Sequence, residues 1–272
     1  MTTVAVTMVK DEADVIGFTV RHMLAEVDRV LVADNLSTDG TRDVLDELAA
    51  SSAGRLVVVD DPDPRYHQSA KMTALALRAR LDMGAEWVVP FDADEWWYSP
   101  FGRIADVLAG VAPQWLIAPA QLFDHVATAE DDLDELDPIR RLGFRRRNRN
   151  PLPKVACRWR EDLTIEQGNH DATYAGGGTR FAEHLVVRHF PYRSIEQLVR
   201  KVRNGAAAYR ATDLPEHFGA HWRQWGDLLD QRGEEAIAEL FRTWYWRDRP
   251  REPIELGGTW EPSLLFDPAP GS

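Results

Sequence analysis

Three acidic side chains directly follow an apolar segment of the sequence. In "WVVPFDADEWW", residues 87–97, the apolar run ends at Phe91, and Asp92, Asp94 and Glu95 come next. Carboxylates that converge on one point repel one another unless a proton or a cation neutralises them. A positive partner is therefore expected close to these residues.

The spacing of the first two carboxylates suits a metal site. If the backbone is extended here, Asp92 and Asp94 point to the same side. Such a pair can hold Mg²⁺ or Mn²⁺, with phosphate and water completing the coordination. The alternative for a bare Asp-x-Asp is a helix N-cap or a solvated turn. Glu95 is expected to support the site or contact an acceptor, or else to be an acid at a helix start.

Four short valine-rich runs predict the strands that would position these loops. The expected strands are residues 3–9, 30–33, 55–59 and 87–91, and the helical patterns between them are residues 14–25, 41–50 and 68–83. This alternation predicts an α/β fold with a mostly parallel sheet flanked by helices. Ligands of such sheets bind beyond the carboxyl ends of the strands. We therefore expect the loops "VKDE", "DNLSTDGT" and "DADE" to meet at one edge.

The second half of the chain shows a looser pattern. Short strands are expected at residues 115–123, 163–166 and 185–189, a tryptophan-rich helical region at residues 222–246, and an irregular tail from Arg249. Ser194 begins "SIEQ", which has the spacing of a capping box and predicts a helix. We expect a main domain at residues 1–193 and a helical C-terminal extension at residues 194–272.

Composition excludes several classes of function. The 272 residues carry a net charge of -12, which argues against stable binding to nucleic acid or anionic lipid. Cys157 is the single cysteine, so the chain forms no internal disulfide and no thiolate metal cluster. No segment approaches the roughly 20 apolar residues of a membrane span, and the N-terminal apolar run is too short for a signal peptide. We expect a soluble, cytoplasmic protein.

Four motifs together carry a resemblance to a known family. "DNLSTDGT" resembles the "DDGSTDGT" signature of family 2 glycosyltransferases, with "DNL" in place of "DDG", and "DADE" resembles their Asp-x-Asp metal motif. "VTMVKDEADVI" is similar to the "KNE" opening of a family 2-like branch, and "RHFPYRSIEQLVRKVRNG" is similar to its "HYP-R-S" segment. The resemblance extends over about residues 4–205.

The resemblance implies a Rossmann-like fold of the GT-A type. It further implies that a sugar, hexosyl in class, moves from a nucleoside diphosphate sugar to an acceptor hydroxyl, with a divalent metal and with inversion. Asp34 would contact the nucleobase, Asp94 would bind the metal, and Asp92 would contact the ribose or support the metal. The other implied nucleotide-binding residues are Val9, Lys10, Glu12, Asn35 and Ala93; Lys10 has a solvated surface lysine as its alternative. The departing diphosphate must also be neutralised, and the basic candidates for this are Lys71, Arg145, Arg146, Arg147, Arg149, Arg193 and Lys201. Most of these have a surface side chain as the alternative, and Lys201 is preferred because its helix begins soon after His189.

His189 is the third metal-ligand candidate. In "EHLVVRHFP" it alternates with apolar residues, and a histidine on such a face is often a core residue. In the family, a late histidine completes the metal coordination, and "HFP" matches its place. An imidazole beside carboxylates favours Mn²⁺, which accepts nitrogen more readily than Mg²⁺.

Transfer also requires a base on the face of the sugar opposite the diphosphate. The family supplies a carboxylate between the metal motif and the late histidine, and we expect His170 or Asp171 of "QGNHD" in this role. The alternative is an ordinary turn. The candidates weighed for this role are Glu161, Asp162, Glu166, His170 and Asp171.

Two other functions were weighed against glycosyl transfer. A nucleotidyltransferase would need a glycine- and arginine-rich phosphate loop after the first strand, and "TMVKDEAD" has none. A non-catalytic sugar- or nucleotide-binding protein of the same fold would be expected to lose the acidic motif, which is intact. The expected acceptor is a glycan, a small molecule or a protein. The tryptophan-rich helices are expected to cover the acceptor site or to pair with a second copy in a homo-oligomer.

Overall fold

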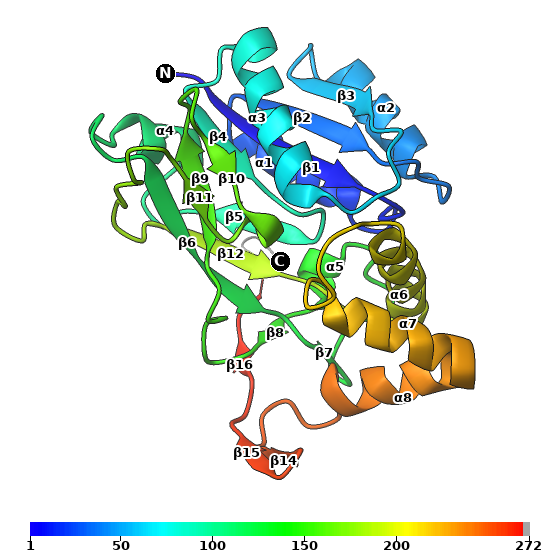
Figure 1. The fold of residues 1–272 in the computed structure, drawn as a ribbon. Helices are drawn as coiled ribbons and strands as arrows, with labels where there is room; N and C mark the ends of the chain where they lie inside the picture. Colours follow the sequence, from blue (N-terminus) through cyan, green and yellow to red (C-terminus); the bar gives the residue numbers. More distant parts are fainter. Residues whose placement is uncertain (269–272) are drawn as a thin grey trace. The chain divides into compact units, whose positions relative to one another are not determined.

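The computed structural model describes residues 1–268, which form two compact units (Figure 1). Unit 1 comprises Met1–Pro62, His67–Phe123 and Arg149–His189, and unit 2 comprises Asp63–Tyr66, Asp124–Asn148 and the chain from Phe190 onward. The boundary expected between residues 193 and 194 stays a prediction. Within residues 1–268, no helix combines the length and the apolar character needed to cross a membrane.

Unit 1 contains an eight-stranded sheet of order β3-β2-β1-β4-β9-β6-β12-β5. The strands are β1 (Thr3–Val9), β2 (Arg29–Asp34), β3 (Leu56–Asp60), β4 (Trp87–Pro90), β5 (Glu95–Tyr98), β6 (Ile117–Asp124), β9 (Lys154–Arg158) and β12 (Leu185–His189). Strands β1 to β4 pair in parallel, as the sequence predicted. The pairs β4–β9, β6–β9 and β12–β5 are antiparallel. The predicted α/β class is therefore confirmed.

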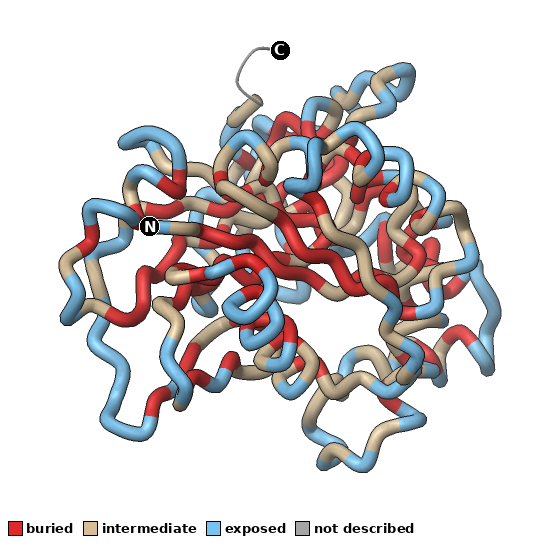
Figure 2. Tube along the Cα trace, turned by 90° about the horizontal axis from the view of Figure 1, so that it is seen from above, coloured by how far each residue is buried: buried red, intermediate tan, exposed pale blue. Residues whose placement is uncertain are grey.

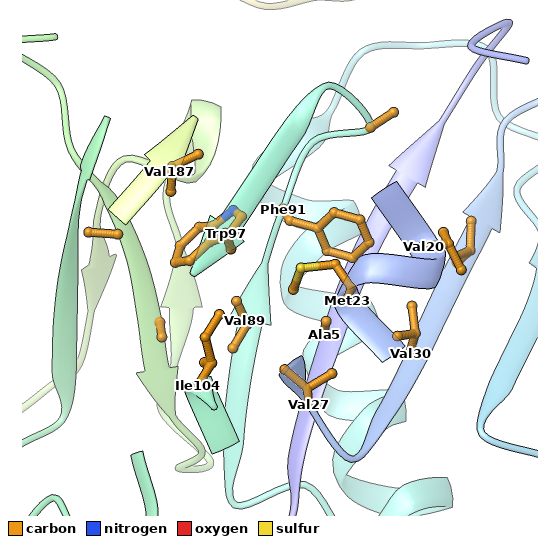
Figure 3. Close-up of a cluster of buried hydrophobic side chains, with 14 of the residues drawn as sticks. Ala5, Val20, Met23, Val27, Val30, Val89, Phe91, Trp97, Ile104 and Val187 are labelled. Carbon is orange, nitrogen blue, oxygen red and sulfur yellow. The ribbon is translucent and has the colours of Figure 1, made fainter. Parts of the chain in front are cut away.

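Helices cover both faces of this sheet. They are α1 (Ile16–Glu26), α2 (Thr41–Ser51), α3 (Gln68–Met83) and α4 (Ile104–Ala109). One apolar cluster joins α1, α2 and α4 to Ala5, Phe91 and Trp97 (Figure 3), and a second joins α3 to Val4 and Val6. Neighbouring residues of β1 thus pack on opposite faces, which explains why its sequence is continuously apolar. Figure 2 shows the central strands as buried.

A small hairpin of unit 1 packs on the start of α3. It consists of β10 (Thr164–Ile165) and β11 (Ala172–Thr173), with a single 3-10 turn at Gln167–Asn169 between them. Ile165 is held at both backbone groups, because its N–H donates to Thr73 Oγ1 at 3.0 Å and its carbonyl accepts from Ser69 Oγ at 2.6 Å. These bonds fix the turn close to the first residues of α3.

Unit 2 carries the predicted C-terminal helices. Its elements are α5 (Pro138–Arg141), α6 (Ile195–Arg210), α7 (Ala220–Arg232) and α8 (Glu234–Trp244), with the short strands β7 (Ala127–Thr128), β8 (Phe144–Arg145), β13 (Trp246–Arg247), β14 (Ile254–Leu256), β15 (Thr259–Glu261) and β16 (Leu265–Phe266). Ser194 caps α6 as predicted, since its Oγ accepts from Gln197 N at 3.1 Å. The expected tryptophan-rich helix is divided at Gly233, whose φ is +76°.

The tail of unit 2 is more regular than the sequence suggested. β14 and β15 form a hairpin, and β16 pairs with β8. The basic segment "FRRRNRNP" contributes to this order, because Arg145 pairs with Asp267 at 2.8 Å and Arg146 with Glu261 at 2.6 Å. Proline and glycine content alone did not reveal these charge pairs.

Helix α1 is tied to the edge strand β5 by His22. Its Nε2–H donates to the carbonyl of Trp97 at 2.5 Å, and its ring lies 4.4 Å from that of Trp96. Burial lowers the pKa of His22 to about 4, and the nearby Arg188 acts in the same direction. The imidazole is therefore neutral in the folded protein near pH 7.

We expect His22→Gln to reduce the pH dependence of folding stability. The unfolded chain takes up a proton near pH 6.5 and the folded chain only near about 4, so the unfolded state binds more protons between these values. The stabilisation is complete above pH 6.5 and is lost as the pH falls towards about 4, by about 2 to 3 kcal/mol. Urea unfolding of both proteins across this window measures the difference.

His217 supplies the matched control, because it is exposed. His217→Gln is expected to leave the pH dependence of the unfolding free energy as it is in the wild-type protein. An identical pH dependence in the wild type and in His22→Gln would contradict the assignment.

Candidate functional site

The three polar loops lie at one edge of unit 1. The parallel register places Val9 opposite Asp34, at the ends of β1 and β2, and Val6 opposite Pro90 of β4. The pairing continues just past the strand ends, since Asn35 N donates to Val9 O at 2.8 Å and Phe91 N donates to Val6 O. The loops after β1, β2 and β4 therefore start side by side, as parallel pairing requires.

The loops after β1 and β2 are bonded to each other. Asp11 Oδ1 accepts from the N–H of Thr38 at 2.6 Å, and Lys10 Nζ donates to the carbonyl of Leu36 at 2.7 Å. Asp11 and Leu36 both have positive φ values, 53° and 59°. Such conformations cost energy in residues other than glycine and are found at functional sites. Lys10, expected to be near the nucleotide or on the surface, holds this strained loop.

The predicted base-contact residue lies within the same loops. Asp34 is 7% exposed, and its Oδ1 accepts from Ser37 N at 3.3 Å. Asn35 and Lys71 share one partner, because Asn35 Nδ2 donates to Asp61 Oδ2 at 2.9 Å and Lys71 Nζ pairs with the same oxygen at 2.7 Å. Asn35 and Lys71, two of the predicted nucleotide-binding residues, are thus linked through Asp61.

Three more of the residues predicted to bind the nucleotide lie along this edge. Val9 is buried in the core under the loops. Glu12 begins the turn into α1, with its carbonyl accepting from Ile16 N at 2.9 Å. Ala93 is also buried, and its carbonyl accepts from Thr19 Oγ1 at 2.7 Å.

The acidic segment is a turn between β4 and β5. Glu95 N donates to Asp92 O at 3.0 Å, which closes the turn. The extended backbone assumed from the sequence is therefore corrected. Asp92 and Asp94 have different neighbours, because the turn changes the direction of the chain between them.

Asp92 faces a buried lysine that the sequence did not single out. Lys154, the first residue of β9, is 3% exposed. Its Nζ lies 2.7 Å from Asp92 Oδ2 and 2.6 Å from Glu95 Oε1. Burial lowers the pKa of Lys154, but the two carboxylates more than reverse this, so its pKa lies above the ordinary value. This ammonium is the positive partner that the clustered acids required.

Glu95 is enclosed completely, with 0% exposure. Its Oε2 accepts from the N–H of Asp92 and from Trp97 Nε1, both at 3.1 Å. Burial raises the pKa of Glu95 to about 7, against the lowering effect of Lys154. Because no part of Glu95 reaches the surface, its position favours support of the turn over contact with an acceptor.

Asp94 and His189 lie next to each other. His189 Nε2 is 3.8 Å from Asp94 Oδ1, and the pairing of β12 with β5 sets His189 opposite Glu95. One divalent ion with bonds of about 2.1 Å to each atom could span this separation. Within residues 1–268, no three His, Cys, Asp or Glu side chains are grouped as metal ligands. The pair therefore fits a metal that takes its other ligands from phosphate and water.

His170 and Asp171 have different surroundings. His170 Nδ1 lies 2.9 Å from the carbonyl of Pro153, and burial and then Lys154 lower the pKa of His170. Asp171 pairs with Arg180, and its Oδ1 also accepts from Ala172 N at 2.6 Å. His170 is thus within the electrostatic influence of the Lys154 group, whereas the contacts of Asp171 fit a role in its own turn.

Lys201 and the aromatic residues of β5 have contacts of their own. Lys201 belongs to α6 of unit 2, where its Nζ donates to Pro191 O at 3.4 Å, so its predicted phosphate contact stays a prediction. Of the aromatic residues of β5, which directly follow the acidic turn, Trp97 is core. Trp96 and Tyr98 point to the other face of β5, where the Arg188 guanidinium lies 5.2 and 5.3 Å from their rings.

The residues that the sequence did not reveal are those that hold Asp92. Gln68 Nε2 and Asn169 Nδ2 donate to Asp92 Oδ1 at 3.2 and 3.1 Å, beside the bond from Lys154 to Oδ2. One signal was present, since Lys154 opens the apolar run "KVACRW" and a lysine is rarely buried without a partner. Nothing in the sequence identified the partner.

The comparison with protein families matches the part of the chain that carries both acidic loops. Residues 4–106 match the model of glycosyl transferase family 2. The match covers less than half of the chain, and over this range the sequence is similar to that family. The matched range includes Asp34, Asp92, Asp94 and Glu95, and it ends before Lys154, His170 and His189. No curated protein matches the sequence.

Three solved structures illustrate what the whole chain is similar to. A mannosyltransferase from Pyrobaculum calidifontis, in complex with GDP-Man and Mn²⁺, is 16% identical over 89% of this chain and 74% of that one, with a TM-score of 0.48. Glucosyl-3-phosphoglycerate synthase from Mycobacterium tuberculosis, in complex with Mn²⁺ and UDP, is 19% identical over 45% and 44%, with a TM-score of 0.30. S. aureus TarS 1-349 is 11% identical over 100% and 98%, with a TM-score of 0.37. At these TM-scores, neither donor nor acceptor follows for this chain.

We expect Lys154→Met to lower the free energy of unfolding by about 3 to 5 kcal/mol, because it leaves buried Glu95 without its cation. Adding Glu95→Gln removes the buried charge, so the double variant is expected to regain part of the loss. Arg78→Met, which breaks an exposed pair with Asp82 at 3.2 Å, is the matched control and should cost little. Urea unfolding measures all three. Equal destabilisation of the single and double variants would show that the charge of Glu95 is unimportant.

Proposed function

We propose that this protein is a metal-dependent glycosyltransferase that moves a sugar from a nucleoside diphosphate sugar to an acceptor hydroxyl. In a chain whose residues 4–106 are similar to glycosyl transferase family 2, the observation that carries the proposal is the meeting, at one edge of unit 1, of the Asp34 loop with the turn that bears Asp94 beside His189. A nucleotide bound over the ends of β1 and β2 would have its diphosphate next to that pair.

The nucleotide half of the site is assigned to the first two loops. Asp34 is proposed to contact the base, with Lys10, Asn35 and Lys71 shaping the loops around it. Their bonds to Leu36 and Asp61 support this, because a strained loop held by its neighbours is already in its binding conformation.

The metal half is assigned to Asp94 and His189. A bound Mn²⁺ or Mg²⁺ would neutralise the charge that develops on the departing diphosphate. Asp92 is proposed to support this arrangement through Lys154 and to face the ribose with its 31% exposed side chain.

His170 is proposed as the base. A carbonyl only accepts hydrogen bonds, so Nδ1 must donate to Pro153 O, and Nε2 of the neutral ring keeps its lone pair. The lowered pKa supports a neutral ring near pH 7. Nε2 would take the proton of the acceptor hydroxyl. At the same time the hydroxyl oxygen would bond to C1 of the sugar, and the bond between C1 and the diphosphate would break. Attack opposite the leaving group inverts the configuration at C1.

Three further properties stay predictions: a hexosyl donor, a cytoplasmic location, and pairing of the tryptophan-rich helices with another copy. The acceptor is proposed to be a glycan, a small molecule or a protein, in keeping with the negative net charge of -12.

We expect one class of nucleotide sugar to stabilise the protein against heat only when Mn²⁺ is present. Saturation with donor should raise Tm by about 5 °C or more, and Asp94→Ala should abolish the shift because it removes a proposed metal ligand. Thermal unfolding with UDP-, GDP-, TDP- and CDP-sugars, with and without Mn²⁺, measures this. Asp82→Ala, an exposed acid on α3, is the matched control. No shift with any donor would refute the proposal.

We expect His170→Gln to retain binding of Mn²⁺ and donor but to lose about 10² to 10⁴ in kcat, because general base catalysis contributes in that range. Donor affinity is measured by calorimetry and turnover by release of the nucleoside diphosphate. Retained turnover in His170→Gln, together with a loss in Asp171→Asn, would transfer the role to Asp171.

A further inference from the structure

The ammonium group of Lys154 connects the acidic turn to a second turn far along the chain. Besides Asp92 and Glu95, Lys154 Nζ contacts the carbonyl of Gly168 at 2.7 Å. The contacts to Asp92 Oδ2 and Gly168 O are hydrogen bonds, and the contact to Glu95 Oε1 is an ion pair. The side chain of Lys154 is 4% exposed. Its position is therefore set by protein atoms, and solvent has little access to it.

The backbone of Gly168 is held at both of its polar groups. Its carbonyl accepts from Lys154, and its N–H donates to Gln68 Oε1 at 2.8 Å. Gln68 in turn donates to Asp92 Oδ1 at 3.2 Å, and Asn169 donates to the same oxygen at 3.1 Å. Three routes thus join the turn at Gly168 and Asn169 to the carboxylate of Asp92.

The position of the His170 ring depends on this turn. Gly168 and Asn169 both have positive φ values, 78° and 57°. A Cβ atom on Gly168 would lie 2.4 Å from Cδ2 of His170, so the ring packs directly against the glycine. The other side of the ring is fixed by Pro153, the residue before Lys154. The two contacts that orient the His170 ring therefore come from Gly168, which is hydrogen-bonded to Lys154, and from Pro153, which precedes Lys154 in the chain.

The Lys154 ammonium group also holds the turn that carries Asp94 of the proposed metal-binding pair. Asp94 lies between Asp92 and Glu95, and both of these carboxylates bind Lys154. Glu95 also binds Trp97 Nε1, which anchors the turn to the core. Asp92 and Glu95 both contact the ammonium, and the carboxylate of Asp94, which lies between them in the sequence, is 3.8 Å from His189 Nε2.

We propose that Lys154 is a positioning residue that sets the distance between the Asp94–His189 pair and His170. Through Asp92 and Glu95 it holds the turn that binds the metal, and through Gly168 it holds the ring that accepts the proton. This inference rests on the proposed function, because it requires a metal at Asp94 and His189. Lys154 itself touches neither substrate nor metal. A base displaced by about 1 Å can lower turnover about 10²-fold, so this spacing matters for the reaction.

The test measures the spacing directly with Mn²⁺ as a paramagnetic probe. Histidine side chains are labelled with ¹³C, and the signals of His170 and His189 are assigned from His170→Gln and His189→Gln. Bound Mn²⁺ broadens a signal according to its distance from the ion. In the wild-type protein, we expect the signal of His189 to disappear and that of His170 to broaden when Mn²⁺ is added together with the nucleoside diphosphate of the stabilising donor.

Two variants change the spacing in different ways. Lys154→Met with Glu95→Gln removes the link without leaving a fully buried carboxylate unpaired, and Gly168→Ala moves the ring of His170 while leaving the contacts of Lys154 to Asp92 and Glu95. In both, Mn²⁺ should still remove the His189 signal, but the broadening of His170 should fall, and kcat should fall with little change in KM for the donor. Arg78→Met is the control and should match the wild type.

The outcomes separate this inference from the proposed function. If Mn²⁺ broadens neither histidine in the wild-type protein, the metal site is refuted and the inference with it. If His189 is affected in all proteins and His170 broadens as strongly in both folded variants as in the wild type, only the positioning role of Lys154 is refuted. If only Gly168→Ala reduces the broadening of the His170 signal, the turn at Gly168 positions the ring and Lys154 does not.

Discussion

A single buried ammonium group, that of Lys154, stabilises the acidic turn of unit 1. Asp92 and Glu95 approach closely enough that mutual repulsion and the loss of hydration would disfavour the folded chain without a cation. Lys154 lies within 2.7 Å of both. Burial raises the pKa of Glu95 to about 7, which shows how strongly this environment disfavours an isolated charge. Asp94, in the same turn, lies 3.8 Å from His189 at the edge of the sheet.

The loops around this edge are held in shape before any ligand is bound. Asp11 and Leu36 adopt left-handed backbone conformations that L-residues disfavour, and hydrogen bonds between the two loops hold them. Lys10 Nζ donates to the carbonyl of Leu36, and the N–H of Asp11 donates to Ser37 Oγ. The bond from Lys10 to the carbonyl of Leu36 and the bond from Thr38 to Asp11 run in opposite directions between the loops. The nucleotide proposed to bind here would meet preformed surfaces, which would limit the entropy lost on binding.

Much of the positive charge of this acidic protein is used by its own carboxylates. Arg145 and Arg146 bind acids of the C-terminal tail, Arg180 binds Asp171, and Lys71 binds Asp61. The basic segment that looked like a phosphate contact in the sequence thus has a structural role in unit 2. A diphosphate at the edge of unit 1 would depend on a metal for charge neutralisation, which agrees with the proposed Asp94–His189 pair.

The sequence by itself determined the parallel half of the sheet and the edge at which the site lies. Valine-rich runs alternating with helical patterns fixed strands β1 to β4 and helix α3, because continuous apolar runs and a 3.6-residue period are properties of adjacent residues. The motifs around Asp34 and Asp94 carried the resemblance to family 2 glycosyltransferases for the same reason. Tertiary structure alone decided which acids contact Lys154 and which lies beside His189. The turn at Asp92–Glu95, the antiparallel strand β9 and the turn at Gly168 come from three distant segments, and the ion pairs among them exist only when long-range strand pairing has brought Lys154 beside them. Sequence patterns describe neighbours along the chain, whereas a buried charge is governed by its neighbours in space.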